Sequence, residues 1–155
     1  MNNAFSSDAR DLFKARNIIV HALNNGGATV KHDYTGLSLT DKTGYIVGGY
    51  APSVSYNVPL VDVWNVAITS GDVAITTRRY VAAFRVDALA YALHKYVVSS
   101  PRHDAVEYVG LWYENDCITF DVVRIVSGIW SAVNVARLNK QTAIYDIRNA
   151  EDIEV

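Results

Sequence analysis

The chain has 155 residues, which suits a single domain that buries roughly two-thirds of its unfolded surface without disulfides or metals. Half of the residues are hydrophobic, 19% are charged and the formal net charge is −2. This composition excludes a disordered chain and leaves no basic footprint for nucleic acid or an anionic membrane, so we expect neither as a partner. The single cysteine, Cys117, cannot form an internal disulfide, which favours a reducing compartment.

The N-terminal stretch MNNAFSSDARDLFKAR is charged by residue 8 and has no apolar core, so it does not resemble a signal peptide. The longest uncharged run, residues 43–61, is long enough to span a membrane. Its glycines, prolines and spread tyrosines instead indicate strands and loops. We therefore expect a cytoplasmic protein.

The first element in chain order is a helix that begins near Ser6–Ser7 and ends at Gly26–Gly27, because apolar residues recur at helical spacing between these signals. Residues 28–34 and 44–50 then have strand composition. The glycine pair Gly48–Gly49 inside the second of these predicts a bulge or a close backbone approach.

The sequence VAIT occurs twice around Ser70–Gly71–Asp72, which predicts a hairpin with strands near 60–69 and 73–84. A helix follows over 86–98, with Asp87 at its start and Pro101 beyond its end.

A third helix is predicted over 128–139, with Ile129, Val133 and Ala136 on one face. Residues 142–147 alternate as a last strand, and the tail after them is acidic. The order of elements predicts one α+β domain over residues 1–155, with a mainly antiparallel sheet and about three helices packed on one face.

The most informative stretch is YVGLWYENDCITFDVVRIV, residues 108–126, which predicts a hairpin with a two-residue turn at Asn115–Asp116. In this register Glu107 pairs with Arg124, and side chains alternate between two faces. The predicted core face holds Val109, Leu111, Tyr113, Ile118, Phe120 and Val122, and the outer face holds Tyr108, Trp112, Thr119 and Asp121.

The polar residues of this hairpin fit structural roles better than catalytic ones. Cys117 flanks the predicted turn, and as a nucleophile it would need a histidine base, for which His103 is nearest in sequence. Asp121 is expected on an exposed strand face, with acid–base chemistry as the alternative. The four histidines lack metal-ligand spacing and no glycine-rich phosphate loop is present, so we expect no catalytic residue, no metal and no cofactor.

The chain has ten tyrosines and three tryptophans, residue types that are enriched where proteins contact each other. Tyr45, Tyr50 and Tyr56 cluster along the uncharged segment 43–61. They form a candidate binding surface together with Tyr108, Trp112, Thr119 and Asp121. The alternative is that about half of the tyrosines belong to the core.

The stretch 108–126, the following VARLNKQ and the strand TAIYDI together resemble a pattern found in small uncharacterised accessory proteins of bacteriophages, chiefly phages of actinobacteria. The resemblance covers residues 105–150 well, and GYIVGGY looks like the first half of those proteins. The similar proteins usually have a glycine in the turn, where this chain has Asn115–Asp116. The resemblance implies a phage or mobile-element accessory protein in a bacterial host, and it brings no known functional residues.

These observations favour a non-enzymatic accessory protein that acts by binding a host or phage protein, with counter-defence or host takeover as the role by analogy. Two alternatives stay open. One is a small-ligand-binding protein or an enzyme with an unfamiliar site on the outer face of the 107–124 hairpin. The other is a structural protein that assembles with copies of itself.

Overall fold

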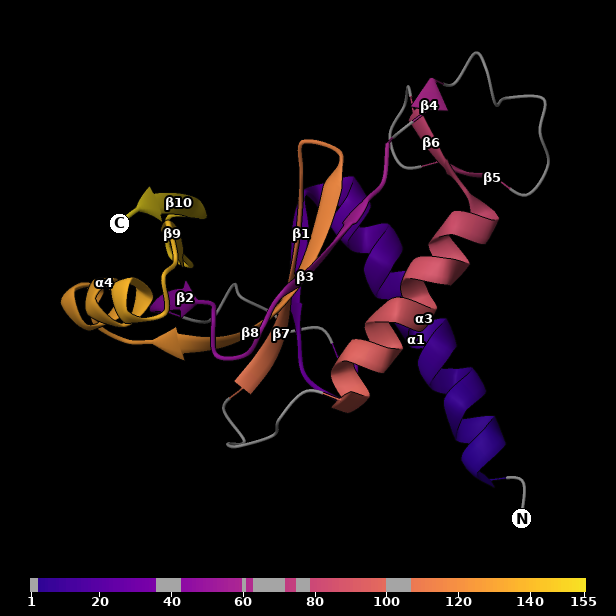
Figure 1. The fold of residues 1–155 in the computed structure, drawn as a ribbon, viewed down its shortest axis with the longest axis horizontal. Helices are drawn as coiled ribbons and strands as arrows, with labels where there is room; N and C mark the ends of the chain where they lie inside the picture. The colour runs from indigo at the N-terminus through magenta and orange to yellow at the C-terminus, as the bar shows by residue number, and fades with distance from the viewer. Residues whose placement is uncertain (1–2, 36–42, 60, 63–71, 75–78, 100–106) are drawn as a thin grey trace. The chain divides into compact units, whose positions relative to one another are not determined.

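The structure is a computed structural model that describes residues 3–35, 43–59, 61–62, 72–74, 79–99 and 107–155 (Figure 1). Its helices are α1 (Asn3–Asn25), α3 (Ala83–Ser99) and α4 (Ile129–Leu138). Its strands are β1 (Gly27–Val30), β2 (Tyr45–Val47), β3 (Val54–Asn57), β4 (Val61–Asp62), β5 (Asp72–Ala74), β6 (Arg79–Ala82), β7 (Glu107–Glu114), β8 (Cys117–Val126), β9 (Ala143–Asp146) and β10 (Glu151–Glu154).

Seven strands form one sheet with the order β1-β7-β8-β2-β9-β10, and β3 also pairs with β8. Strands β4, β6 and β5 form a second sheet, in that order. The pairs β2–β8, β2–β9 and β9–β10 are antiparallel. The predicted α+β class with a mainly antiparallel sheet is confirmed.

The chain divides into two compact units, and strands β1, β3, β7 and β8 contribute residues to both. The first unit comprises residues 1–28, 55–99 and 111–120, and the second comprises residues 29–54, 100–110 and 121–155. The expectation of one domain stays a prediction.

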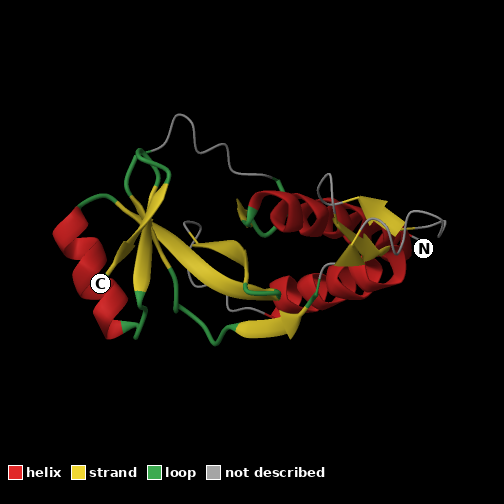
Figure 2. Cartoon of the chain, turned by 90° about the horizontal axis from the view of Figure 1, so that it is seen from above, coloured by secondary structure: helices red, strands yellow, loops and turns green. Residues whose placement is uncertain are grey.

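The first unit is built on the packing of α1 against α3 (Figure 2). Small and branched side chains of α1, among them Ala15 and Ile19, are buried, and so are Leu89 and Leu93 of α3. At the surface the Arg16 guanidinium Nε lies 3.0 Å from an Asp87 carboxylate oxygen. Helix α1 ends at Asn25, as the glycine pair predicts, because Gly26 has a φ of +83° that ends the helix.

The second unit is built on α4, which packs against β2 and β9. Its core consists of Val47, Ala132, Ala136 and Ile144. Both inward residues of α4 are alanines, and small side chains let a helix approach a sheet closely. Of the three residues predicted to share one face of this helix, Ala136 is buried and Ile129 is exposed, while Ala132 takes the other inner position.

The hairpin of β7 and β8 turns where the sequence predicts. Strand β7 ends at Glu114 and β8 begins at Cys117, while Asn115 and Asp116 have φ values of 52° and 60°. Two consecutive positive φ values indicate a type I′ turn, which matches the twist of the flanking strands. Five of the six predicted core-face residues are buried, and Tyr113 is half-buried.

Asp116, the second residue of this turn, has a left-handed φ, which favours glycine over aspartate. We expect Asp116→Gly to raise the free energy of unfolding by about 0.5–1 kcal/mol, measured by urea denaturation. The Asp116 carbonyl accepts the Val58 N–H at 2.6 Å, and this backbone bond survives the change. A variant less stable than the native chain would contradict the prediction.

Two strand predictions need correction. Only residues 28–30 of the predicted 28–34 strand belong to β1, because the chain turns back where the Tyr34 N–H donates to the Lys31 carbonyl at 2.9 Å. The acidic tail is also a strand, since β10 pairs with β9 and Ile153 packs against the core of the second unit. The predicted VAIT hairpin lies largely outside the described residues.

Candidate functional site

The seven candidate binding residues lie in different surroundings. Trp112, Thr119 and Tyr56 belong to the first unit, where the Tyr56 ring centroid is 5.5 Å from that of Phe120. The Thr119 hydroxyl makes a 2.8 Å hydrogen bond with Ser55. Tyr45, Tyr50, Tyr108 and Asp121 belong to the second unit. Their role in binding stays a prediction.

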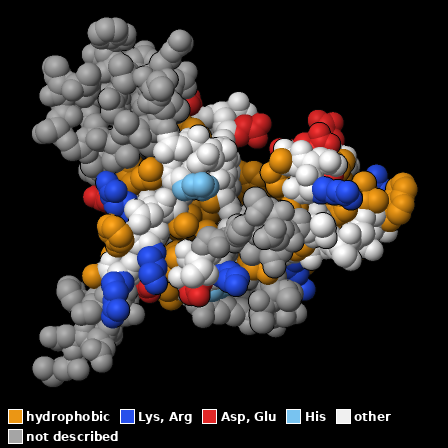
Figure 3. Space-filling model, turned by 180° about the vertical axis from the view of Figure 1, so that it is seen from behind, with side chains coloured by type: hydrophobic (Ala, Val, Ile, Leu, Met, Phe, Trp, Pro, Cys, Tyr) orange, Lys and Arg blue, Asp and Glu red, His pale blue; other side chains and the backbone are white. Residues whose placement is uncertain are grey.

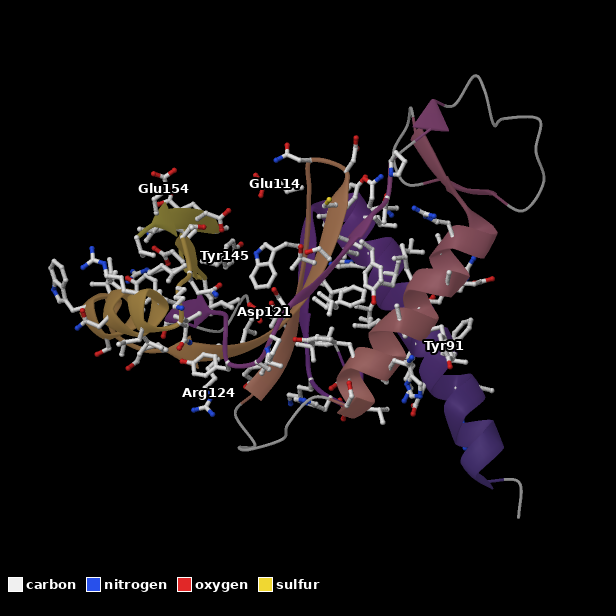
Figure 4. The ribbon with its side chains drawn as sticks, viewed as in Figure 1. Tyr91, Glu114, Asp121, Arg124, Tyr145 and Glu154 are labelled. Carbon is white, nitrogen blue, oxygen red and sulfur yellow. The ribbon has the colours of Figure 1, made fainter. Side chains whose placement is uncertain are left out.

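Asp121 differs from its predicted surroundings, because it is only 5% exposed although it lies on the outer face of the hairpin. The exposed strand face predicted for this residue is therefore wrong. The segment Gly48–Tyr50 runs along this part of β8, and Tyr50 N–H donates to the Val122 carbonyl at 3.3 Å. Figure 4 shows Asp121 among the packed side chains, while Glu154 projects outward from β10.

The Asp121 carboxyl has one well-defined partner. Its Oδ2 accepts the Gly49 N–H at 2.9 Å, whereas Oδ1 is buried and has no hydrogen-bond partner among the described residues. Burial raises the pKa of Asp121 from 3.8 to about 6, against the opposing effect of the Gly49 and Val122 amides. A carboxyl with this pKa changes its charge just below neutral pH.

The glycine pair allows this close contact, as the sequence predicted. A Cβ atom at Gly48 would overlap Asp121 Oδ2 and would lie 2.9 Å from Gln141 Oε1. Gly49 has a φ of +83°, and a Cβ there would lie 2.6 Å from Gln141 Nε2. A side chain at either position would therefore overlap neighbouring atoms, so both positions require glycine.

The end of α4 completes the cluster around Asp121. Gln141 N–H donates to the Ala136 carbonyl at 2.8 Å and Lys140, with a φ of 58°, donates to the Arg137 carbonyl at 3.1 Å, which is the Schellman ending of a helix. This ending places the side chain of Asn139 so that its Nδ2 donates to the Gly48 carbonyl at 2.9 Å. Gln141 Nε2 in turn donates to the Asn139 carbonyl at 3.2 Å.

Comparison with protein families, with curated proteins and with solved structures finds no match. The candidate sites therefore rest on the geometry of this chain.

The outer face of α4 is the second notable feature, and sequence reasoning missed it. Trp130 is 80% exposed and Leu138 is 81% exposed, and both lie on the side of the helix opposite Ala132 and Ala136. Figure 3 shows hydrophobic and basic side chains exposed side by side over α4, at the right edge of that view. The helical spacing of Trp130, Asn134 and Leu138 is the signal that could have identified this face.

Arg124 and Tyr50 form a further contact in the second unit. The guanidinium carbon of Arg124 lies 4.5 Å from the centroid of the Tyr50 ring, within the range of a cation–π interaction. This contact and the hydrogen bond from Tyr50 N–H hold the predicted binding residue Tyr50 against β8.

Cys117 lies exposed beside the turn, as predicted. In the part of the chain that the structure describes, no group of three or more histidine, cysteine, aspartate or glutamate side chains is arranged to hold a metal ion. No helix within the same residues is long and apolar enough to cross a membrane.

Proposed function

We propose that this chain is a non-enzymatic accessory protein of the kind that phages and mobile elements encode, and that it acts by binding another protein through the outer face of α4. The observation that carries this proposal is the exposure of Trp130 and Leu138 on one side of a short helix. The partner in this proposal is a host or phage protein.

The spacing of these side chains suits insertion into a groove. Trp130, Asn134 and Leu138 are four residues apart, so they form one row along two turns of helix. A tryptophan that is four-fifths exposed leaves a large apolar area in water, and tryptophan is among the residues that most often dominate binding energy.

The positive charge at the end of α4 indicates the chemistry of the partner surface. Arg137 is the only charged residue in the helix, and Lys140 follows its last turn. Both residues are exposed, and no carboxylate occurs between Val122 and Tyr145 in the sequence. A partner surface with an apolar groove and carboxylates at one end would complement this face.

The biological role follows from the phage resemblance of residues 105–150 and from analogy. Small phage proteins that bind host proteins serve counter-defence or host takeover, and we propose this role for the present chain. The proposal places it in the cytoplasm of a bacterial host.

The test is a tagged pull-down from bacterial lysate with the native chain and with the variants Trp130→Ala and Leu138→Ala. We expect the native chain to retain a stoichiometric partner, and each variant to bind it at least about 30-fold more weakly, as for a residue that dominates an interface. Tyr91→Ala is the matched control, because Tyr91 is also an exposed aromatic residue on a helix but lies on α3.

Three other outcomes would contradict the proposed interface on α4. Loss of the partner with Tyr91→Ala, and not with Trp130→Ala, would move the interface to α3. Association of the chain only with itself, measured by light scattering after gel filtration, would favour the self-assembling alternative. A small molecule released on denaturation, without any protein partner, would favour the ligand-binding alternative.

A further inference from the structure

We propose that Asp121 is a proton-operated latch inside the second unit: its protonated carboxyl holds the Gly48–Gly49 segment and the end of α4 together, and its ionised form loosens them. This inference goes beyond the proposed function and does not depend on it. It rests on the hydrogen bond that this buried carboxyl accepts from Gly49, on its other oxygen, which has no hydrogen-bond partner among the described residues, and on the packing of Gln141 beside Gly48.

The two buried aspartates of the second unit differ in their hydrogen bonds. Asp146 is 6% exposed, and both of its carboxylate oxygens are satisfied, by the Arg148 and Asn149 amides and by Asn149 Nδ2 at 2.8 Å. Asp121 is equally buried, but its Oδ1 has no partner among the described residues. A buried negative charge with an unsatisfied oxygen is costly, so the ionised form of Asp121 is disfavoured.

Among the described residues, no group beside Asp121 carries a positive charge that would neutralise it. Its own strand offers the Val122 amide, and the neighbouring segment offers the Gly49 amide. The end of α4 offers the carboxamides of Asn139 and Gln141, which do not titrate.

The one nearby cation on β8 is turned away. Arg124 follows Asp121 by three residues, and alternation along a strand sends the two side chains to opposite faces. Its guanidinium lies over the Tyr50 ring. The shift in the pKa of Asp121 therefore reflects burial opposed by two amides, with no charged partner among its causes.

We assign Gln141 Oε1 as the acceptor for a proton on Asp121. Gln141 Oε1 and Asp121 Oδ2 both crowd the position that a Cβ of Gly48 would occupy. A neutral carboxyl can donate toward this carboxamide oxygen while still accepting the Gly49 N–H. In this form the carboxyl joins β8, the glycine pair and the end of α4.

The stability of the closed second unit depends on pH through the Asp121 carboxyl. The folded pKa, about 6, is above the ordinary value of 3.8, so the closed unit binds the proton more tightly than an opened one. The stabilisation is complete below about pH 4 and is lost as the pH rises through 6. With these two pKa values, the equilibrium constant for opening of the second unit is about tenfold larger at pH 7.5 than at pH 5.

The experiment is hydrogen exchange of the backbone amides in residues 44–50 and 137–142 at pH 5 and pH 7.5, corrected for the intrinsic rate at each pH. We expect the native chain to show about tenfold more opening at the higher pH. Asp121→Asn keeps the size of the side chain and cannot ionise, so its corrected protection should be the same at both pH values. Asp146→Asn is the matched control, and it should keep the tenfold ratio.

Two results would overturn the latch. One is a native chain with equal protection at both pH values, and the other is an Asp121→Asn variant that keeps the full pH dependence. If Asp121→Asn does not fold, a carboxyl ¹³C NMR titration of the native chain decides the matter: a midpoint near 4 for Asp121 refutes the proposal, and a midpoint near 6 supports it.

Discussion

Gly48→Ala is expected to destabilise the chain by about 3–5 kcal/mol or to prevent folding, since a methyl group there overlaps a buried carboxyl. The φ of Gly48 is not left-handed, so alanine can adopt its backbone conformation and the cost comes from contact alone. The added Cβ would displace Asp121 Oδ2 from Gly49 and press on Gln141. The measurement is urea denaturation followed by circular dichroism.

Gly128→Ala is the matched control for this prediction. Gly128 precedes α4, and the nearest atom to a Cβ there is Ser131 Oγ at 3.9 Å. Gly128→Ala should lower the free energy of unfolding by less than about 1 kcal/mol, the usual effect of a weakened helix N-cap. A second check is Asp121→Ala in the Gly48→Ala background, which should recover part of the lost stability because it removes the overlapping atoms. Equal effects of the two glycine changes would refute the packing argument.

Phe120→Ala should cost about 3–5 kcal/mol, the usual result of emptying a fully buried aromatic site. Phe120 is the largest of the side chains that are completely buried among the described residues. Its ring contacts Tyr56 at a centroid distance of 5.5 Å and Tyr96 of α3 at 6.1 Å, so the change removes packing between the hairpin, β3 and α3. Thermal and urea unfolding would measure the loss.

Tyr91→Ala provides the comparison, because Tyr91 also belongs to α3 but is 58% exposed. Its effect should stay within about 0.5 kcal/mol, as for most surface changes. Phe120→Leu should fall between the two, since leucine refills part of the volume. A Phe120→Ala variant as stable as Tyr91→Ala would show that this part of the first unit is loosely packed.

Local signals account for the parts of the fold that the sequence predicts. The end of α1 at Gly26, the helix over residues 86–98 and the turn at Asn115–Asp116 each depend on residues adjacent in the chain. Strand β10 was missed because its acidic residues have low strand propensity, and pairing with β9 overrides that preference.

The candidate site was less predictable, because its contacts join distant parts of the chain. Alternation along β8 assigns Asp121 to the outer face, but it cannot tell that the segment after β2 covers this position. The glycine pair did predict a close approach, although not the carboxyl that approaches it. Exposure of Trp130 depends on which face of α4 packs inward, and two alanines, which allow the closest approach, take that face.

Strand β10 ends the strand order of the larger sheet, and three of its four residues are Glu151, Asp152 and Glu154, all exposed. A terminal strand carries backbone donors and acceptors that can recruit a strand from another molecule. Carboxylates along it repel an identical strand from a second copy, so at neutral pH the charge works against fibril-like growth from this edge.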